Sequence, residues 1–107
     1  MKKNILILIF ALLSSTTARA QLSGQFVGSV TDPSGSAVPE AKVTVIEVAT
    51  GFSRSVVAGV EGFYSVPSLR PAVYKITVEA PGFHTSAQDG ITLEADQSAT
   101  VNFKLVL

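Results

Sequence analysis

Few side chains in this sequence could take part in catalysis. The chain of 107 residues has one histidine, His84, and no cysteine. A zinc site of the usual kind needs three or four ligands from histidine, cysteine or carboxylate side chains. A serine nucleophile needs a base, which would have to be His84, and a third group that orients this base. The sequence has neither a Gly-x-Ser-x-Gly elbow nor a glycine-rich phosphate loop. We therefore expect no enzyme activity, no catalytic residue, no metal and no cofactor.

Carboxylates lie near one another in the sequence at two places. Asp89, Glu94 and Asp96 flank one short predicted strand, and Asp32 and Glu40 flank the first predicted turn. Carboxylate oxygens can hold Ca²⁺. The spacing fits no EF-hand loop, however, and acidic residues are common in turns. We therefore expect these groups to be solvated turn residues.

Exposed aromatic rings would allow carbohydrate binding, because the flat apolar face of a sugar stacks on them. The chain has no tryptophan. The alternation of the predicted strands assigns most aromatic residues to the core and leaves Phe52 and Phe63 free to be exposed. These two are the candidate sugar-stacking residues. A common exposed surface would support this role, and burial would exclude it.

The elements that would position these groups follow an N-terminal export signal. Lys2 and Lys3 give a positive start, residues 5–13 are apolar, and Ala18 and Ala20 place small residues at both key positions of a signal-peptidase site. This is the three-part pattern of a secretory signal peptide. The apolar run is too short to span a bilayer, which takes about 20 residues. We therefore predict export to the periplasm, the outer membrane or the outside of the cell, with no membrane span after cleavage.

Cleavage would leave one domain, residues 21–107, after a signal peptide at residues 1–20. The whole chain has 8 basic and 8 acidic residues, and the signal peptide contains three of the basic ones. The mature net charge is therefore 5 − 8 = −3. A mildly acidic domain with scattered charges gives no indication of nucleic-acid binding.

The mature sequence alternates with period two and is rich in β-branched and aromatic residues, which is typical of β-strands. The predicted strands are residues 24–31, 41–49, 52–58, 62–66, 73–80, 83–86 with 91–94, and 97–106. Turn residues separate them. Asp32 begins a predicted type I turn, Asp89-Gly90 is a predicted tight hairpin, and Pro67 is a predicted strand end.

Two stretches have a spacing of turn and core residues that is specific enough for comparison with a known family. The central one reads Gly62-x-Tyr64-x-Val66-x-x-Leu69-x-Pro71-x-x-Tyr74-x-Ile76-x-Val78-x-Ala80-x-Gly82-Phe83. The first reads Gly28-Ser29-Val30-Thr31-Asp32-Pro33-Ser34-Gly35, followed by Val38-Pro39-x-Ala41-x-Val43-x-Val45. Over nearly all of residues 24–106, the chain resembles the carboxypeptidase regulatory-like domain.

This resemblance implies an all-β, seven-stranded, transthyretin-like (prealbumin-like) β-sandwich without peptidase chemistry. It implies packing roles for Leu69 at one end of the core and Phe83 at the other. Tyr74 resembles a buried tyrosine whose hydroxyl ties a crossing loop to a strand. The fold class is shared with starch-binding-like modules, so a carbohydrate-binding module of that fold is the alternative function.

The favoured function is an interaction or accessory module that binds an unidentified protein partner through an edge strand or an outward apolar face. Edge strands carry unpaired N–H and C=O groups that can pair with an extended segment. The outward-facing Ile46, Val48 and Val106 are the candidate contact surface, unless a flanking loop covers them. The favoured edge is the predicted strand 97–106, where Lys104 alone provides a protecting charge.

In bacteria, domains of this family commonly lie near the N-terminus of TonB-dependent outer-membrane receptors or within surface proteins. The sequence leaves two settings open. The chain is either a free-standing module or the N-terminal extension of a truncated receptor of this kind.

Overall fold

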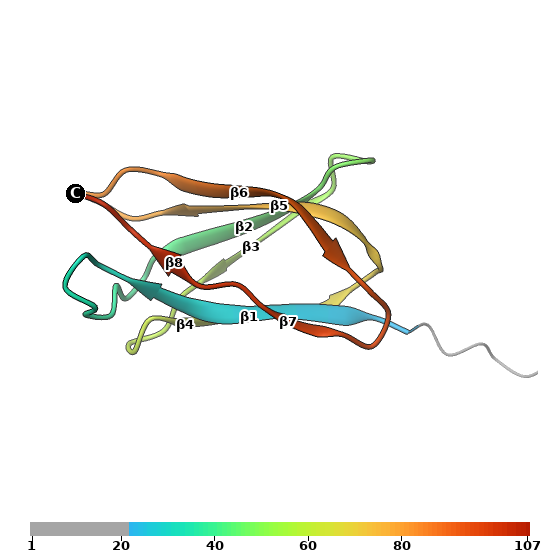
Figure 1. Ribbon diagram of the computed structural model, residues 1–107, viewed down its shortest axis with the longest axis horizontal. Coiled ribbons are helices and arrows are strands. Elements are labelled where there is room, and N and C mark those ends of the chain that lie inside the picture. Colours follow the sequence, from blue (N-terminus) through green and yellow to red (C-terminus); the bar gives the residue numbers. More distant parts are fainter. Residues whose placement is uncertain (1–21) are drawn as a thin grey trace, which may run out of the picture.

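Two β-sheets packed against each other form the part of the chain that the structure describes, residues 22–107 of a computed structural model (Figure 1). The strands are β1 (Gly24–Thr31), β2 (Lys42–Glu47), β3 (Ser53–Val57), β4 (Phe63–Leu69), β5 (Ala72–Glu79), β6 (Ser86–Leu93), β7 (Ser98–Thr100) and β8 (Phe103–Lys104). One sheet has the order β4-β1-β7, with β8 also paired to β1, and the other has the order β3-β2-β5-β6. The predicted all-β sandwich is confirmed.

The predicted signal peptide, residues 1–20, lies outside the described residues, so export stays a prediction. Residues 22–107 form no helix, so this part of the chain contains no helix that is long and apolar enough to cross a membrane.

The core lies between the sheets, and the period-two alternation explains which side chains reach it. In β2, Val43 and Val45 are buried, whereas Thr44 between them is only half-buried. The buried apolar side chains are Phe26, Val30, Val38, Ala41, Val43, Val45, Ala58, Tyr64, Val66, Leu69, Tyr74, Ile76, Val78, Leu93, Val101, Phe103 and Leu105. The rings of Phe26 and Tyr74 pack edge to face with centroids 5.5 Å apart, an arrangement that aromatic pairs favour.

The residues with predicted packing roles do contact this core. Leu69 and Tyr74 are buried, and Phe83 is half-buried and packs against the core from the loop after β5. The hydroxyl of Tyr74 donates a hydrogen bond to the carbonyl oxygen of Arg70 at 2.6 Å. Since Arg70 lies in the loop between β4 and β5, this bond is the predicted tie between a crossing loop and a strand.

Two predicted interruptions are bulges inside continuous strands. Between Tyr74 and Ile76 of β5, the partner strand β6 contains one extra residue, because their partners are Ile91 and Gln88. Gly90, with φ of 67°, lies in this bulge. The predicted hairpin at Asp89-Gly90 is therefore wrong, and the two predicted short strands around it are the single strand β6.

The second bulge lies in β4, which continues through Pro67 as far as Leu69. Val66 and Leu69 of β4 lie opposite Phe26 and Gly24 of β1, so β4 contains one extra residue between them. Ser68 has a φ of 59° there. The predicted strand end at Pro67 is wrong because β4 is an edge strand, where a bulge accommodates a proline that cannot donate to the ladder.

The last predicted strand, residues 97–106, is divided into β7 and β8. Both pair in parallel with β1 and keep one register, since Val27 lies opposite Thr100 and Val30 lies opposite Phe103. The division is therefore a local interruption of one edge strand. It explains why eight strands are present where seven were predicted.

Side chains replace the backbone pairing at this interruption. The amide N–H of Ser29 donates to Oδ1 of Asn102 at 2.9 Å, and the carbonyl oxygen of Val101 accepts a hydrogen bond from the Tyr64 hydroxyl at 2.5 Å. The Tyr64 ring lies against Gly28, where a Cβ atom would be 1.9 Å from the Val101 oxygen. Glycine at this position is therefore required for the bond. The sequence shows the alternation of the strand but not which groups bond its backbone.

Candidate binding site

The polar groups that could support catalysis are dispersed. Among residues 22–107, no three His, Asp or Glu side chains lie close enough together to hold a metal ion. Asp32 stabilises its own turn, because its Oδ1 accepts hydrogen bonds from the amides of Ser34 and Ser36 at 2.9 and 3.0 Å. A bond from the Ser34 hydroxyl, together with these amides, holds the pKa of Asp32 below its ordinary value. His84 is exposed, and its backbone amide donates to the carbonyl oxygen of Val106 at 2.8 Å.

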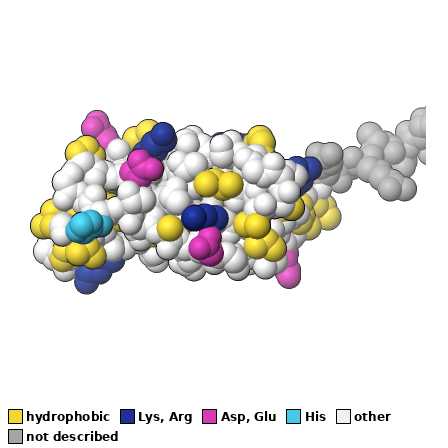
Figure 2. All heavy atoms as spheres, turned by 90° about the horizontal axis from the view of Figure 1, so that it is seen from above, with side chains coloured by type: hydrophobic (Ala, Val, Ile, Leu, Met, Phe, Trp, Pro, Cys, Tyr) yellow, Lys and Arg dark blue, Asp and Glu magenta, His cyan; other side chains and the backbone are white. Residues whose placement is uncertain are grey.

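The candidate contact residues Ile46, Val48 and Val106 do not form one surface. Ile46 is half-buried on β2, and the exposed Val48 follows β2 and donates its amide to the carbonyl oxygen of Val73, near the start of β5. Val106 lies beside His84, beyond the end of β5. Because β5 is eight residues long, Val106 is at the opposite end of the sandwich. Figure 2 shows one face of the molecule, on which hydrophobic side chains form several separate groups.

Phe52 and Phe63 are both exposed, by 49% and 63%, but they lie in different depressions. Near the start of β3, the Arg54 side chain donates a hydrogen bond to the carbonyl oxygen of Pro67, near the end of β4. After β3, the amide of Gly59 donates to the carbonyl oxygen of Phe63, at the start of β4. The two rings therefore lie at opposite ends of the β3–β4 side of the sandwich. They do not form one platform for a sugar.

The depression at Phe63 has a volume of about 280 Å³ and no charged side chain in its wall. Its other lining residues are Val27, Gly28, Tyr64, Thr100 and Asn102. The amide oxygen of Asn102 is already bonded to the amide and hydroxyl of Ser29. Few polar groups therefore remain there to orient a ligand.

The depression at Phe52 has a volume of about 210 Å³ and contains two arginines. It is lined by Phe52, Arg54, Ser68, Leu69, Arg70 and Tyr74. Apolar and charged groups are therefore combined at one place, which is the usual composition of a small-molecule site. Residues of three elements meet here: the β2–β3 hairpin, the end of β4 with the loop after it, and β5.

The hairpin between β2 and β3 positions Phe52. The amide of Glu47 donates to the carbonyl oxygen of Phe52 at 2.8 Å, and the amide of Gly51 donates to the carbonyl oxygen of Glu47 at 2.8 Å. Gly51 has a φ of 75°, which a glycine adopts without strain. The turn thus brings Phe52 beside Glu47, at the end of β2.

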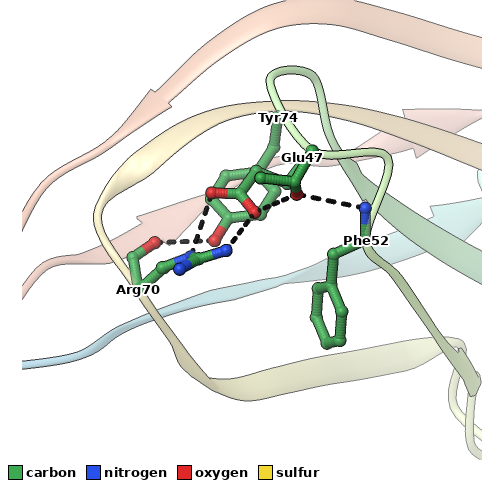
Figure 3. A network of polar contacts seen from close by, with 5 residues as sticks. Glu47, Phe52, Arg70 and Tyr74 are labelled. Carbon is green, nitrogen blue, oxygen red and sulfur yellow. Dashed lines mark hydrogen bonds and ion pairs between the residues drawn. The ribbon is translucent and has the colours of Figure 1, made fainter.

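Glu47 is the centre of a polar network (Figure 3). Its residue surface is only 4% exposed, since it follows Val43 and Val45 on the inward side of β2. Arg70 binds it at two points, with Nε 3.0 Å from Oε1 and Nη2 2.8 Å from Oε2. The hydroxyl of Thr50 also donates to Oε2. The hydrogen bonds from Arg70, and then that from Thr50, hold the pKa of Glu47 below its ordinary value.

The same network extends to the aromatic ring. The amide of Phe52 donates to the Thr50 hydroxyl oxygen at 3.2 Å, so Phe52 and Arg70 are connected through Thr50 and Glu47 (Figure 3). The guanidinium carbon of Arg54 lies 5.8 Å from the centre of the Phe52 ring, within the range of a cation–π contact. Nη1 of Arg54 also donates to the carbonyl oxygen of Pro67. Both arginines and the ring are thus held by contacts within the domain.

Sequence reasoning identified Phe52 but missed Glu47, Arg54 and Arg70. The signal for Glu47 was its position, because a carboxylate at an inward strand position requires a partner. No comparable signal marks Arg54 or Arg70, since each is an isolated cation in the sequence.

The model of the carboxypeptidase regulatory-like domain matches residues 25–106. No curated protein matches the chain. Solved structures share the fold. A protein of Bacteroides uniformis to which carbohydrate binding is provisionally ascribed has a TM-score of 0.64 and 18% identity, over 78% of this chain and 41% of its own. The Bacillus anthracis TIE protein has a TM-score of 0.68 and 17% identity, over 79% of this chain and 16% of its own.

A third structure is the dioxygenase domain of a dioxygenase–carbohydrate-binding protein fusion from Streptomyces sp. SirexAA-E, with a TM-score of 0.61 and 12% identity. The match covers 86% of this chain and 84% of that domain. This chain spans less than half the length of the Bacteroides and Bacillus proteins. At these identities the likenesses show the fold alone. The family match covers most of the sequence, and the chain therefore belongs to the carboxypeptidase regulatory-like domain family.

Proposed function

We propose that this chain is an exported, non-catalytic accessory module that works by binding an extended segment of a protein along the edge formed by β7 and β8. The signal-peptide pattern supports export. The dispersal of the acidic side chains and His84 over residues 22–107 supports a role in binding rather than in catalysis.

The observation that carries this proposal is the open side of the β7–β8 edge. Three backbone hydrogen bonds join this edge to β1. The amide of Gln25 in β1 donates to the carbonyl oxygen of Gln97, and the amides of Val101 and Leu105 donate to carbonyl oxygens of β1. In a strand, alternate residues direct their N–H and C=O groups to opposite sides. The alternate set comprises Ser98, Thr100, Asn102 and Lys104, and all four are exposed.

These four residues direct their backbone groups away from β1, and within residues 22–107 neither β7 nor β8 pairs with another strand. The edge carries one charge, Lys104, and no proline. Natural edge strands are usually protected by more than this. At Val106 the edge closes, because the carbonyl oxygen of Val106 accepts the amide of His84.

Sedimentation at increasing concentration tests this proposal, because the unpaired N–H and C=O groups of an open edge are a template for pairing with a second copy of the chain. We expect weak, concentration-dependent association. Thr100→Pro should abolish it, since proline removes an outward-facing donor without removing a bond to β1. Thr100→Val, which keeps the amide, is the matched control. Association that Thr100→Pro leaves unchanged would overturn the proposal.

A second candidate function is carbohydrate binding, which the exposed Phe52 ring in its arginine-containing depression favours. The provisional description of the Bacteroides protein of the same fold adds support. Binding of soluble oligosaccharides, lost in Phe52→Ala and retained in Phe63→Ala, would distinguish this function from edge pairing.

The biological setting that we propose is the cell envelope, with the module as the N-terminal extension of a TonB-dependent receptor, a setting that the family resemblance implies. The reading frame beyond Leu107 tests the receptor setting, which predicts a plug and a barrel in continuation. N-terminal sequencing of the envelope fraction tests export, which predicts a mature chain starting at Gln21.

A further inference from the structure

We propose that the depression formed by Phe52, Arg54 and Arg70 binds a carboxylate-bearing sugar, such as a uronic acid residue of an acidic polysaccharide. This inference rests on the second candidate function, carbohydrate binding, and names its ligand class.

The first argument is the charge at the site. Residues 22–107 contain five basic and eight acidic residues, a net charge of 5 − 8 = −3. Within this acidic domain both arginines, Arg54 and Arg70, lie in the wall of one depression. The only carboxylate in their network, Glu47, is buried and already bonded to Arg70 and Thr50. The site therefore has one positive charge in excess, which complements a carboxylate.

The second argument is the donors that remain. Arg70 uses Nε and Nη2 for Glu47, and its side chain is 66% exposed. Its Nη1 has no partner among the described residues. Arg54 uses Nη1 for the carbonyl oxygen of Pro67, which leaves Nε and Nη2. Guanidinium groups are suited to carboxylates because their planar N–H groups match the two oxygens.

The third argument is the shape of the depression. Phe52 is 49% exposed, so one part of its ring is available for the C–H face of a sugar. The volume of about 210 Å³ is below the range of about 300–1,000 Å³ for sites of drug-sized ligands. It therefore fits one sugar unit of a longer chain, the rest of which would remain in solvent.

The fourth argument is that the contacting groups are already ordered. Phe52 is connected to Arg70 through Thr50 and Glu47, and Arg54 is bonded to Pro67. A ligand that meets ordered side chains does not have to restrict their rotamers on binding. Weak contacts with a single sugar unit can then give measurable affinity.

Titration of residues 21–107, the chain expected after signal-peptide cleavage, with trigalacturonate tests the inference. Binding is followed by the chemical shifts of the backbone amides. The matched probe is the methyl ester of the same trisaccharide, which has the same rings without the charges. We expect chemical-shift changes at residues 50–54 and 68–70. The ester should bind more weakly than the acid by about tenfold or more, because it loses a charge-assisted hydrogen bond.

Variants assign the contacts. We expect Phe52→Ala and Arg54→Gln each to weaken trigalacturonate binding by about tenfold, because one removes the ring and the other the excess charge. Phe63→Ala, which truncates the exposed ring of the other depression, is the matched control and should bind as wild type does. Arg70 is left unchanged, since its loss would leave Glu47 buried without a partner.

The possible failures are distinguishable. Equal binding of acid and ester at residues 50–54 would overturn the acidic ligand but keep carbohydrate binding. No shift with either trisaccharide would overturn both the ligand and the second candidate function. Equal binding of polyglutamate would show that the site selects charge rather than sugar, and would overturn the inference.

Discussion

The hydroxyl of Tyr64 donates a hydrogen bond to the carbonyl oxygen of Val101 across the intervening strand β1. This bond joins one edge of the sheet, β4, to the other edge, at the interruption between β7 and β8. It withdraws the Val101 carbonyl from the ladder, while Asn102 supplies a side-chain acceptor to the amide of Ser29. The geometry of the proposed contact edge thus depends on a tyrosine from β4, the opposite edge strand of the same sheet.

We predict that Tyr64→Phe lowers the free energy of unfolding by about 1–3 kcal/mol, because the Val101 carbonyl loses its partner in a buried place. Denaturant titration measures this change. Ser65→Ala, at the exposed neighbour of Tyr64, should change it little. A midpoint for Tyr64→Phe equal to that of wild type would refute the role of this bond.

Alkaline titration of the folded chain should show both tyrosines ionising at a higher pH than in the unfolded chain. Burial raises the pKa of Tyr64 to about 12, and burial also raises that of Tyr74. The unfolded chain ionises near pH 10, so the stabilisation from the neutral phenols is complete below pH 10 and is lost as pH rises toward 12. Tyrosinate absorbance of the native protein checks this. A large tyrosinate signal at pH 10 in the folded chain would contradict it.

Leu69→Ala and Tyr74→Ala should each destabilise the domain by about 2–5 kcal/mol, the range for removing a large side chain from a packed core. Both residues are almost fully buried. Val60→Ala, at a side chain that is 88% exposed, is the control and should be nearly neutral. Denaturant midpoints of the three variants would decide the matter, and similar values for all three would exclude the packing roles.

Glu47→Gln should make stability less sensitive to acid. The pKa of Glu47 is lowered in the folded chain, chiefly by Arg70, so its contribution is complete above its ordinary pKa of 4.5 and is lost as pH falls through the folded value. The difference in unfolding free energy between wild type and Glu47→Gln should therefore be constant above about pH 5.5 and shrink below pH 4.5. Glu61→Gln, at an exposed glutamate, is the control. A difference that stays constant down to pH 2 would contradict the ion pair.

The sandwich was predictable because a strand has a side-chain period of two. Burial on that period requires only local sequence, and Val43, Val45 and Tyr74 are buried as the alternation indicates. The bulges at Ser68 and Gly90 were not predictable in this way. Glycine and proline mark turns and bulges alike, and the pairing partner decides which one forms.

The candidate site was predictable only in part. Phe52 is exposed, as its position outside the core pattern indicates. Its relation to Arg70 depends on the pairing of β2 with β5, which places Glu47 opposite Tyr74 and thereby near the loop before β5. A sequence separation of 23 residues between Glu47 and Arg70 gives no local sign of this contact.

Amide hydrogen exchange along the last strand tests the proposed contact edge most directly. The amides of Val101 and Leu105 bond to β1 and should be protected at every concentration. Those of Thr100 and Lys104 face the open side, so they should exchange rapidly in dilute protein and become protected as concentration rises or a partner segment binds. Exchange of Thr100 and Lys104 that stays rapid at high concentration, or that is slow in the dilute monomer, would contradict the account.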